Sequence, residues 1–199
     1  MTYYITKING TPHWEDIPAV TLDNILWLPD AGVRMVQQIC YDNEALYVHQ
    51  RAVERDIRAE HRDPQAAVCE DSCMEFFFCP DSTSTRYFNF EWNLNGCLFL
   101  GIGEGREDRV RLTMPDGVER FSFRSARTAD GWEIFYRIPL AFIRQHFPRC
   151  TFAAGAIIRA NCYKCGDKTV KPHFLSWNPV TSEQPDFHRS PDFGEMILK

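Results

Sequence analysis

The chain has 199 residues, of which 44% are hydrophobic and 14% aromatic, and its net charge at pH 7 is −5. This length suits one domain with a sizeable core, so we expect residues 1–199 to form a single domain. No basic block is present, which argues against a nucleic-acid partner because phosphate binding needs clustered Lys and Arg. No apolar run is long enough to span a bilayer, so we expect no membrane partner.

The first ten residues lack the basic and apolar segments of an export signal, so we expect a cytoplasmic protein. The eight cysteines are then expected to be reduced and buried as small hydrophobic residues. Two pairs have short spacings, Cys69 with Cys73 and Cys162 with Cys165. Because side chains alternate between the two faces of a strand, these pairs suit a zinc knuckle poorly, and we expect no metal ligands.

Alternating apolar and polar residues predict antiparallel strands along most of the chain. The predicted strands cover residues 3–8, 34–41, 45–53, 71–79, 86–93, 118–127, 132–138, 151–163 and 193–198. A single-turn segment is expected at 14–17, an extended or loop-like one at 20–27, and one short helix at 140–147. The glycines 101, 103 and 105 break the strand pattern without matching a dinucleotide-binding fingerprint. The fold class is therefore all-β, a jelly-roll-like β-sandwich with one short helix.

The stretch 71–93 has two very different faces. Side chains on one face are nearly all apolar: Met74, Phe76, Phe78, Phe88, Phe90 and Trp92. The other face carries the polar residues Asp71, Glu75, Asn89, Glu91 and Asn93. Asn95-Gly96 then marks a hairpin. The polar face is either plain solvent surface or the floor of a polar site.

The charged stretch 54–67 has no apolar stripe and is expected to be a long loop. Such a loop is either solvated or bends over the polar face and lends Arg58, His61 or Arg62 to a ligand.

A second candidate region lies near the C-terminus. Trp177 stands in a Pro-rich loop with polar neighbours that include His173 and His188. The Trp177 ring either packs into the hydrophobic core or is exposed, with one face available to a ligand. Sugar recognition combines an aromatic face with carboxylates and amides that bond hydroxyl groups, and this composition favours the exposed ring.

Glu75 and Glu91 are expected to face each other across neighbouring strands. Paired carboxylates are also the catalytic groups of glycosidases, so a glycoside hydrolase that uses this pair is the alternative function. Arg86 is expected at a strand end with its guanidinium in solvent or paired with an acid. No nucleophile–base arrangement has a recognisable context, so we predict no catalytic residues.

Several segments together resemble the carbohydrate-binding module family 9-like domains. They are DSCMEFFFCP, YFNFEWNLNG, GWEIFYRIPL, RANCYKC and HFLSWNPV, and they occur in the expected order. The resemblance implies a β-sandwich that binds a mono- or oligosaccharide without cleaving it. It also implies a sugar end held between two tryptophans, assisted by Glu, Arg and Asn side chains, and a calcium ion in some members.

The resemblance assigns particular residues to the ligand. Glu75, in a D-S-x-x-E pattern, matches the sugar-contacting glutamate, and Trp177, in an S-W-x-P pattern, matches one of the two aromatics. The other aromatic is missing, because Val68, Cys69 and Glu70 stand where it belongs. Weaker placements complete the predicted ligand-binding set: Asp71, Arg86, Glu91, Asn93, Asn161 and His173. Calcium ligands cannot be placed. A related DOMON-type sandwich that binds haem is a third reading, but no Met and His stand in obvious axial positions.

Overall fold

The computed structural model describes residues 1–114 and 117–199, which contain fourteen strands, one α-helix and four single-turn 3₁₀ segments. The strands are β1 (Thr2–Lys7), β2 (Ala19–Thr21), β3 (Asn24–Ile25), β4 (Arg34–Tyr41), β5 (Ala45–Val53), β6 (Cys73–Cys79), β7 (Tyr87–Asn93), β8 (Leu98–Gly103), β9 (Val110–Arg111), β10 (Arg124–Arg127), β11 (Gly131–Pro139), β12 (Ile157–Cys165), β13 (Phe174–Ser176) and β14 (Gly194–Leu198). The helix is α1 (Leu140–His146), and the 3₁₀ segments are η1 (Trp14–Asp16), η2 (Val68–Glu70), η3 (Glu119–Phe121) and η4 (Ser190–Asp192). The expected all-β class with one short helix is confirmed.

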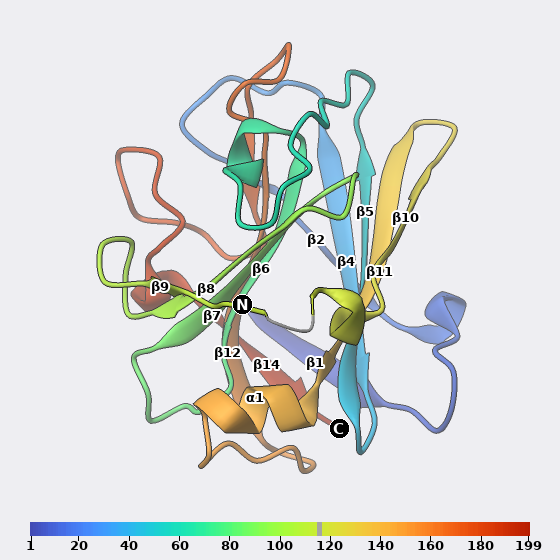
Figure 1. Cartoon of the computed structure of the whole chain (residues 1–199), viewed down its shortest axis with the longest axis vertical. Coiled ribbons are helices and arrows are strands. Elements are labelled where there is room, and N and C mark those ends of the chain that lie inside the picture. The colour runs from blue at the N-terminus through green and yellow to red at the C-terminus, as the bar shows by residue number, and fades with distance from the viewer. Residues whose placement is uncertain (115–116) are drawn as a thin grey trace.

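The strands form one curled mixed sheet that folds over into a sandwich. Its order is β10-β11-β5-β4-β1-β14-β12-β6-β7-β8-β9, and β1 runs parallel to both β4 and β14. Figure 1 shows β4, β5, β10 and β11 on one side, facing β6, β7 and β12 on the other, with α1 across the lower end. Because β1 pairs with a strand of each layer, it joins the two halves of the sandwich.

The core lies between the two layers and contains the predicted apolar face. Phe76, Phe90 and Trp92 are fully buried there, and the Phe90 ring meets the Phe121 ring edge-on at 5.2 Å. From the end of the sandwich, α1 adds Leu140 and Ile143 to the same cluster. Each buried side chain of this size contributes roughly 1.5–3 kcal/mol relative to exposure, so the alternation seen in the sequence accounts for much of the stability.

Some strand boundaries differ from those expected. β4 and β5 have the predicted bounds. Residues 118–127 form η3 followed by the short β10, because Phe121 turns inward to the core. β12 begins at Ile157 rather than 151, after a turn at 153–155. β8 continues through Gly101, where a Cβ would lie only 2.6 Å from the Asn89 side chain. No helix in the described part of the chain is both long and apolar enough to cross a membrane.

Candidate functional site

The antiparallel register of β6 and β7 places Glu75 directly opposite Glu91, as predicted. Directly opposite residues in such a pair have Cβ atoms about 4.5–5.5 Å apart. Glu75 is 2% exposed and Glu91 6% exposed, so this face is covered by other segments. The polar face of the sheet is therefore covered, and is not the plain solvent surface that was one of the two expectations.

A cavity of about 120 Å³ lies over the two carboxyl groups. Its lining residues are Trp27, Cys69, Glu75, Glu91, Arg106, Arg109, Cys165, Asp167, Phe174, Pro185, Asp186, Phe187 and His188. The sheet supplies the floor, and the segments around 27, 106–109, 167 and 185–188 supply the walls. The cavity thus brings together parts of the chain that are far apart in sequence.

Trp27 supplies the main aromatic wall. It is half-buried, and its ring centroid lies 5.4 Å from the rings of both Phe174 and Phe187. Its Nε1 donates to the Ser182 carbonyl at 2.8 Å, which fixes the plane of the indole. The backbone φ of Trp27 is +56°, in the left-handed region that bulky residues rarely adopt. Residues with such unfavourable backbone conformations are concentrated at functional sites.

Two arginines supply positive charge at the cavity. Arg109 Nη1 lies 3.6 Å from Glu91 Oε1, and its guanidinium stacks 4.8 Å from the Phe99 ring centroid. Arg106 pairs with Asp186 at 3.1 Å. The rim therefore carries fixed donors and acceptors around an acidic floor.

Burial changes the protonation of the carboxyl pair. Burial raises the pKa of Glu91 to about 7, against the opposing effects of Arg109 and of the hydrogen bond that Asn89 donates at 2.8 Å. Burial, and next the neighbouring Glu91, raise the pKa of Glu75 well above its usual value. Near neutral pH the pair therefore retains at least one proton, so the floor both donates and accepts hydrogen bonds.

His188 is held neutral beside the pair. Burial, and next the charges of Arg109 and Arg106, lower the pKa of His188 to about 2. Its Nε2 accepts from Arg109, and its Nδ1 is hydrogen-bonded to the Tyr87 hydroxyl at 2.9 Å. The imidazole thus holds Arg109 in place over Glu91.

The structure does not bring Trp177 to this cavity. The ring is 4% exposed, belongs to the cluster between the two layers, and occupies the space beside Gly194, where a Cβ would lie 2.9 Å from it. Asn161 fixes the adjoining loop, since its Nδ2 donates to the Asn178 carbonyl and its Oδ1 accepts from the Asn178 amide. Both residues therefore serve the packing of the C-terminal segment.

Asp71 and Asn93 hold the long loop 54–67 against the sheet. The Asp71 carboxylate accepts from the amides of Glu60 and His61 and from Asn93 Nδ2 at 2.9–3.1 Å. Arg58 Nε lies 3.3 Å from the same carboxylate. The loop does bend over the sheet, but its side chains are outside the lining of the cavity over Glu75.

The remaining two candidates lie elsewhere. Arg86 is exposed just before β7. His173 lines a second, larger cavity of about 690 Å³, together with Glu54. The buried polar groups of that cavity already have partners: His173 Nε2 contacts Lys164 Nζ at 2.7 Å, and Glu54 accepts from Ser72 and Trp132. The smaller cavity is the better candidate, because its carboxyl pair has bonding capacity left for a ligand.

Sequence reasoning missed Trp27, Arg106, Arg109 and Asp186. Trp27 stands two residues before Pro29 in a segment without strand alternation. An aromatic residue in such a loop-like segment was the only feature of the sequence that could have marked it as a site residue. The arginines belong to a charged run that resembles an ordinary solvated loop.

Calcium, which the resemblance implied, can be tested against the donor atoms present. In the described residues, one group of three His, Cys, Asp or Glu side chains converges closely enough to hold an ion: Cys73, Glu75 and Cys165. Calcium takes six to eight oxygen ligands. Two thiols and one carboxyl group therefore do not fit it.

Comparisons with known proteins agree with this architecture. A family model described as carbohydrate-binding family 9 matches residues 11–198. A structure from Bacteroides uniformis, described as a "putative carbohydrate-binding protein", is 27% identical with a TM-score of 0.86, and the match covers 100% of this chain and 99% of that one. A family 9 module from Caldicellulosiruptor kristjanssonii, solved with cellotriose, is 14% identical with a TM-score of 0.69 and coverages of 100% and 94%. A family 9 module from the same organism, solved with glucose, is 14% identical with a TM-score of 0.68, and the match covers 100% of this chain and 96% of that one. No curated protein matched the chain.

Proposed function

The chain belongs to carbohydrate-binding family 9, and from that premise we propose that it binds the end of a saccharide, without cleaving it, in the cavity over Glu75 and Glu91. The observation that carries the proposal is the buried carboxyl pair beside the half-buried side chain of Trp27. Acidic groups bond sugar hydroxyls, and an aromatic ring packs on the C–H face of a sugar.

The size of the cavity sets what enters it. At about 120 Å³, it offers the room of about four water molecules. That room takes only part of one sugar residue, so the rest of the saccharide lies along the rim. A terminal residue fits this arrangement better than the middle of a chain.

Each wall has a role in the proposed complex. A protonated Glu75 donates to one hydroxyl, and Glu91 accepts from a neighbouring one. Arg109, held by His188, donates to a hydroxyl or ring oxygen near Glu91. Trp27 covers the apolar face of the sugar, in place of the tryptophan that is missing around position 69. Arg106 and Asp186 contact the next sugar residue of the saccharide, which lies along the rim outside the cavity.

The direct test is a titration of the protein with glucose, cellobiose and cellotriose, followed by intrinsic tryptophan fluorescence and calorimetry. We expect saturable binding of at least one of them and a fluorescence change that disappears in Trp27→Phe. Absence of heat and of any fluorescence change across a wider panel of mono- and oligosaccharides would overturn the proposal.

Hydrolysis is tested with the same ligands. The raised pKa of Glu91 is a property that a general acid also needs, so the specific alternative is a glycosidase that uses Glu75 and Glu91. Incubation with cellotriose should release no reducing sugar above a buffer blank. Release that stops in Glu91→Gln would establish the hydrolase instead.

A further inference from the structure

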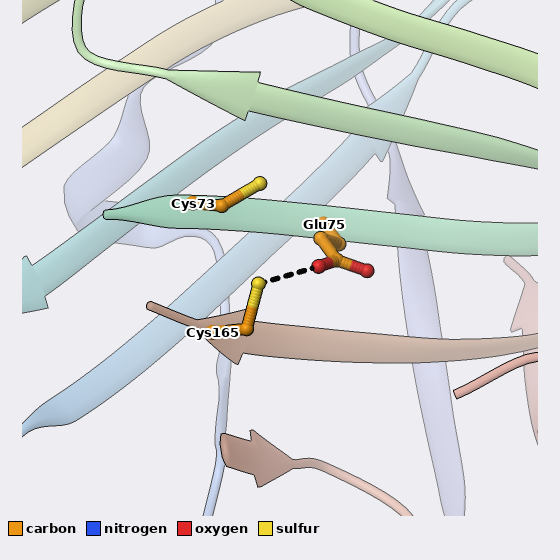
Figure 2. Close-up of side chains that lie close together, drawn as sticks. All are labelled: Cys73, Glu75 and Cys165. Atoms are coloured by element: carbon orange, nitrogen blue, oxygen red, sulfur yellow. Dashed lines mark hydrogen bonds between the residues drawn. The ribbon is translucent and has the colours of Figure 1, made fainter. Parts of the chain in front are cut away.

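We propose that Cys73, Glu75 and Cys165 form a binding site for a soft divalent metal ion, best suited to Zn²⁺, beside the cavity that Glu75 and Cys165 line. Figure 2 shows Cys73 and Glu75 on one strand and Cys165 on its neighbour, with the Cys165 thiol hydrogen-bonded to the Glu75 carboxyl group. One donor atom from each residue lies within 4.8 Å of the other two, and all three residues are buried. The proposal does not rest on the proposed saccharide function, although both use Glu75.

The sheet register produces the cluster. Cys73 and Cys165 lie opposite each other where β6 pairs with β12, and Glu75 stands two residues beyond Cys73 on the same face. Cys165 Sγ already donates to Glu75 Oε1 at 2.9 Å. All three donors are thus placed by strand backbone, which holds a site more firmly than a loop does.

The spacing fits zinc after small side-chain movements. Zinc–sulfur bonds of about 2.3 Å in a tetrahedron place two sulfurs about 3.8 Å apart. The donor separations of up to 4.8 Å are slightly larger, so rotation about the Cys and Glu side-chain bonds closes the site. Thiolates favour zinc over calcium or magnesium.

The short-spaced CxxC pair of the sequence does not itself form the site, and the expectation of no metal ligands rested on such short-spaced pairs. Cys162, the other member of the CxxC pair, faces the core between the two layers, so it cannot join Cys165 at an ion. Because side chains alternate along β12, Cys162 and Cys165 lie on opposite faces of the sheet. The pairing of β12 with β6 instead places Cys73 beside Cys165.

The cavity provides an entry path and a fourth position. Cys165 and Glu75 both line it, as does Cys69, which also lies on the wall. A three-residue donor set with access to a cavity leaves room for a water or a ligand oxygen as fourth ligand.

Metal binding at this site is coupled to proton release. Cysteine binds zinc as the thiolate, so each buried thiol gives up its proton when the ion enters. A divalent cation replaces these protons and neutralises the buried anions. Metal binding therefore releases protons, and the affinity should rise with pH.

The first test uses the wild-type chain, reduced and without saccharide, titrated with Co²⁺ as a spectroscopic substitute for Zn²⁺. We expect a thiolate-to-cobalt charge-transfer band that saturates at one equivalent and is abolished by Zn²⁺. This measurement needs no substitution. A spectrum without the charge-transfer band at excess Co²⁺ would overturn the site, whatever the outcome of the saccharide titrations.

Variants then assign the ligands. Cys73→Ser and Cys165→Ser should each reduce the band and weaken zinc binding at least about tenfold, the loss that even an outer-shell partner typically causes. Glu75→Gln should weaken binding but retain the band. The matched control is Cys79→Ser, on the same face of β6 but at its other end. Equal loss of the band in Cys79→Ser and Cys73→Ser, with both variants folded by circular dichroism, would contradict the assignment.

Discussion

Glu75 and Glu91 stand opposite each other on β6 and β7, both almost completely buried, with Arg109 on one side of the pair and the Cys165 thiol on the other. Burial, and for Glu75 also the neighbouring Glu91, keeps a proton on the floor of the cavity near neutral pH. The buried pair is the basis for the predictions that concern the site.

Replacement of Trp27 by Ala should weaken saccharide binding by about tenfold or more, which corresponds to about 1.4 kcal/mol, because the sugar loses its aromatic wall. Calorimetry with the best ligand of the panel measures the change. Trp14→Ala is the matched control, since Trp14 is also half-buried but packs on His49 and Phe135 outside the cavity lining. Equal affinity in Trp27→Ala and wild type would remove Trp27 from the site.

Glu91→Gln should change how stability depends on pH. Glu91 has a pKa of about 7 in the folded protein, against an ordinary value of 4.5 for a Glu side chain, so between these values the folded state binds more protons than the unfolded state. This carboxyl group therefore makes the free energy of unfolding fall as pH rises from about 4.5 to 7, with no further loss above 7.

The measurement compares urea unfolding of wild type and Glu91→Gln at pH 5 and pH 8. We expect the variant to gain stability relative to wild type at the higher pH. The difference reports Glu91 together with its effect on the pKa of Glu75, whereas the buried His188, whose pKa is lowered, contributes an opposite slope to both proteins. A difference that is independent of pH would contradict the raised pKa.

Lys164→Met should destabilise the fold by about 3–5 kcal/mol, the usual effect of removing one member of a buried ion pair. Lys164 is fully buried and lies 3.1 Å from Glu54 Oε2, so its removal leaves the Glu54 carboxylate without its cation. Adding Glu54→Gln should recover part of the loss in chemical denaturation. A double variant no more stable than Lys164→Met would show that the ion pair is not the cause.

Asp71→Asn should loosen the loop 54–67, because the charged acceptor for the amides of Glu60 and His61 is lost. Hydrogen bonds to a charged group contribute about 1.5–3 kcal/mol each. Hydrogen–deuterium exchange should become faster at these two amides. The control Asp63→Asn changes an exposed acid of the same loop. Unchanged exchange in Asp71→Asn would argue that the loop is held by other contacts.

Strand alternation made several parts of the fold predictable. It identified β4 and β5, the buried apolar face of β6 and β7, and the pairing of Glu75 with Glu91. It did not locate η3, because Phe121 is drawn inward by rings such as Phe90 and Phe142 from distant strands.

The sequence by itself determined the sandwich and the acidic character of one sheet face, because a period of two residues is a local property that each strand carries. Only the tertiary structure decided what covers that face. Trp27 and Arg109 reach the cavity from separate loops, while Trp177 packs in the core. Loop paths depend on long-range contacts, and strand pairing, which also brings Cys165 to Cys73, is set by the whole sheet. The walls of the site and its thiols were therefore beyond the reach of local patterns.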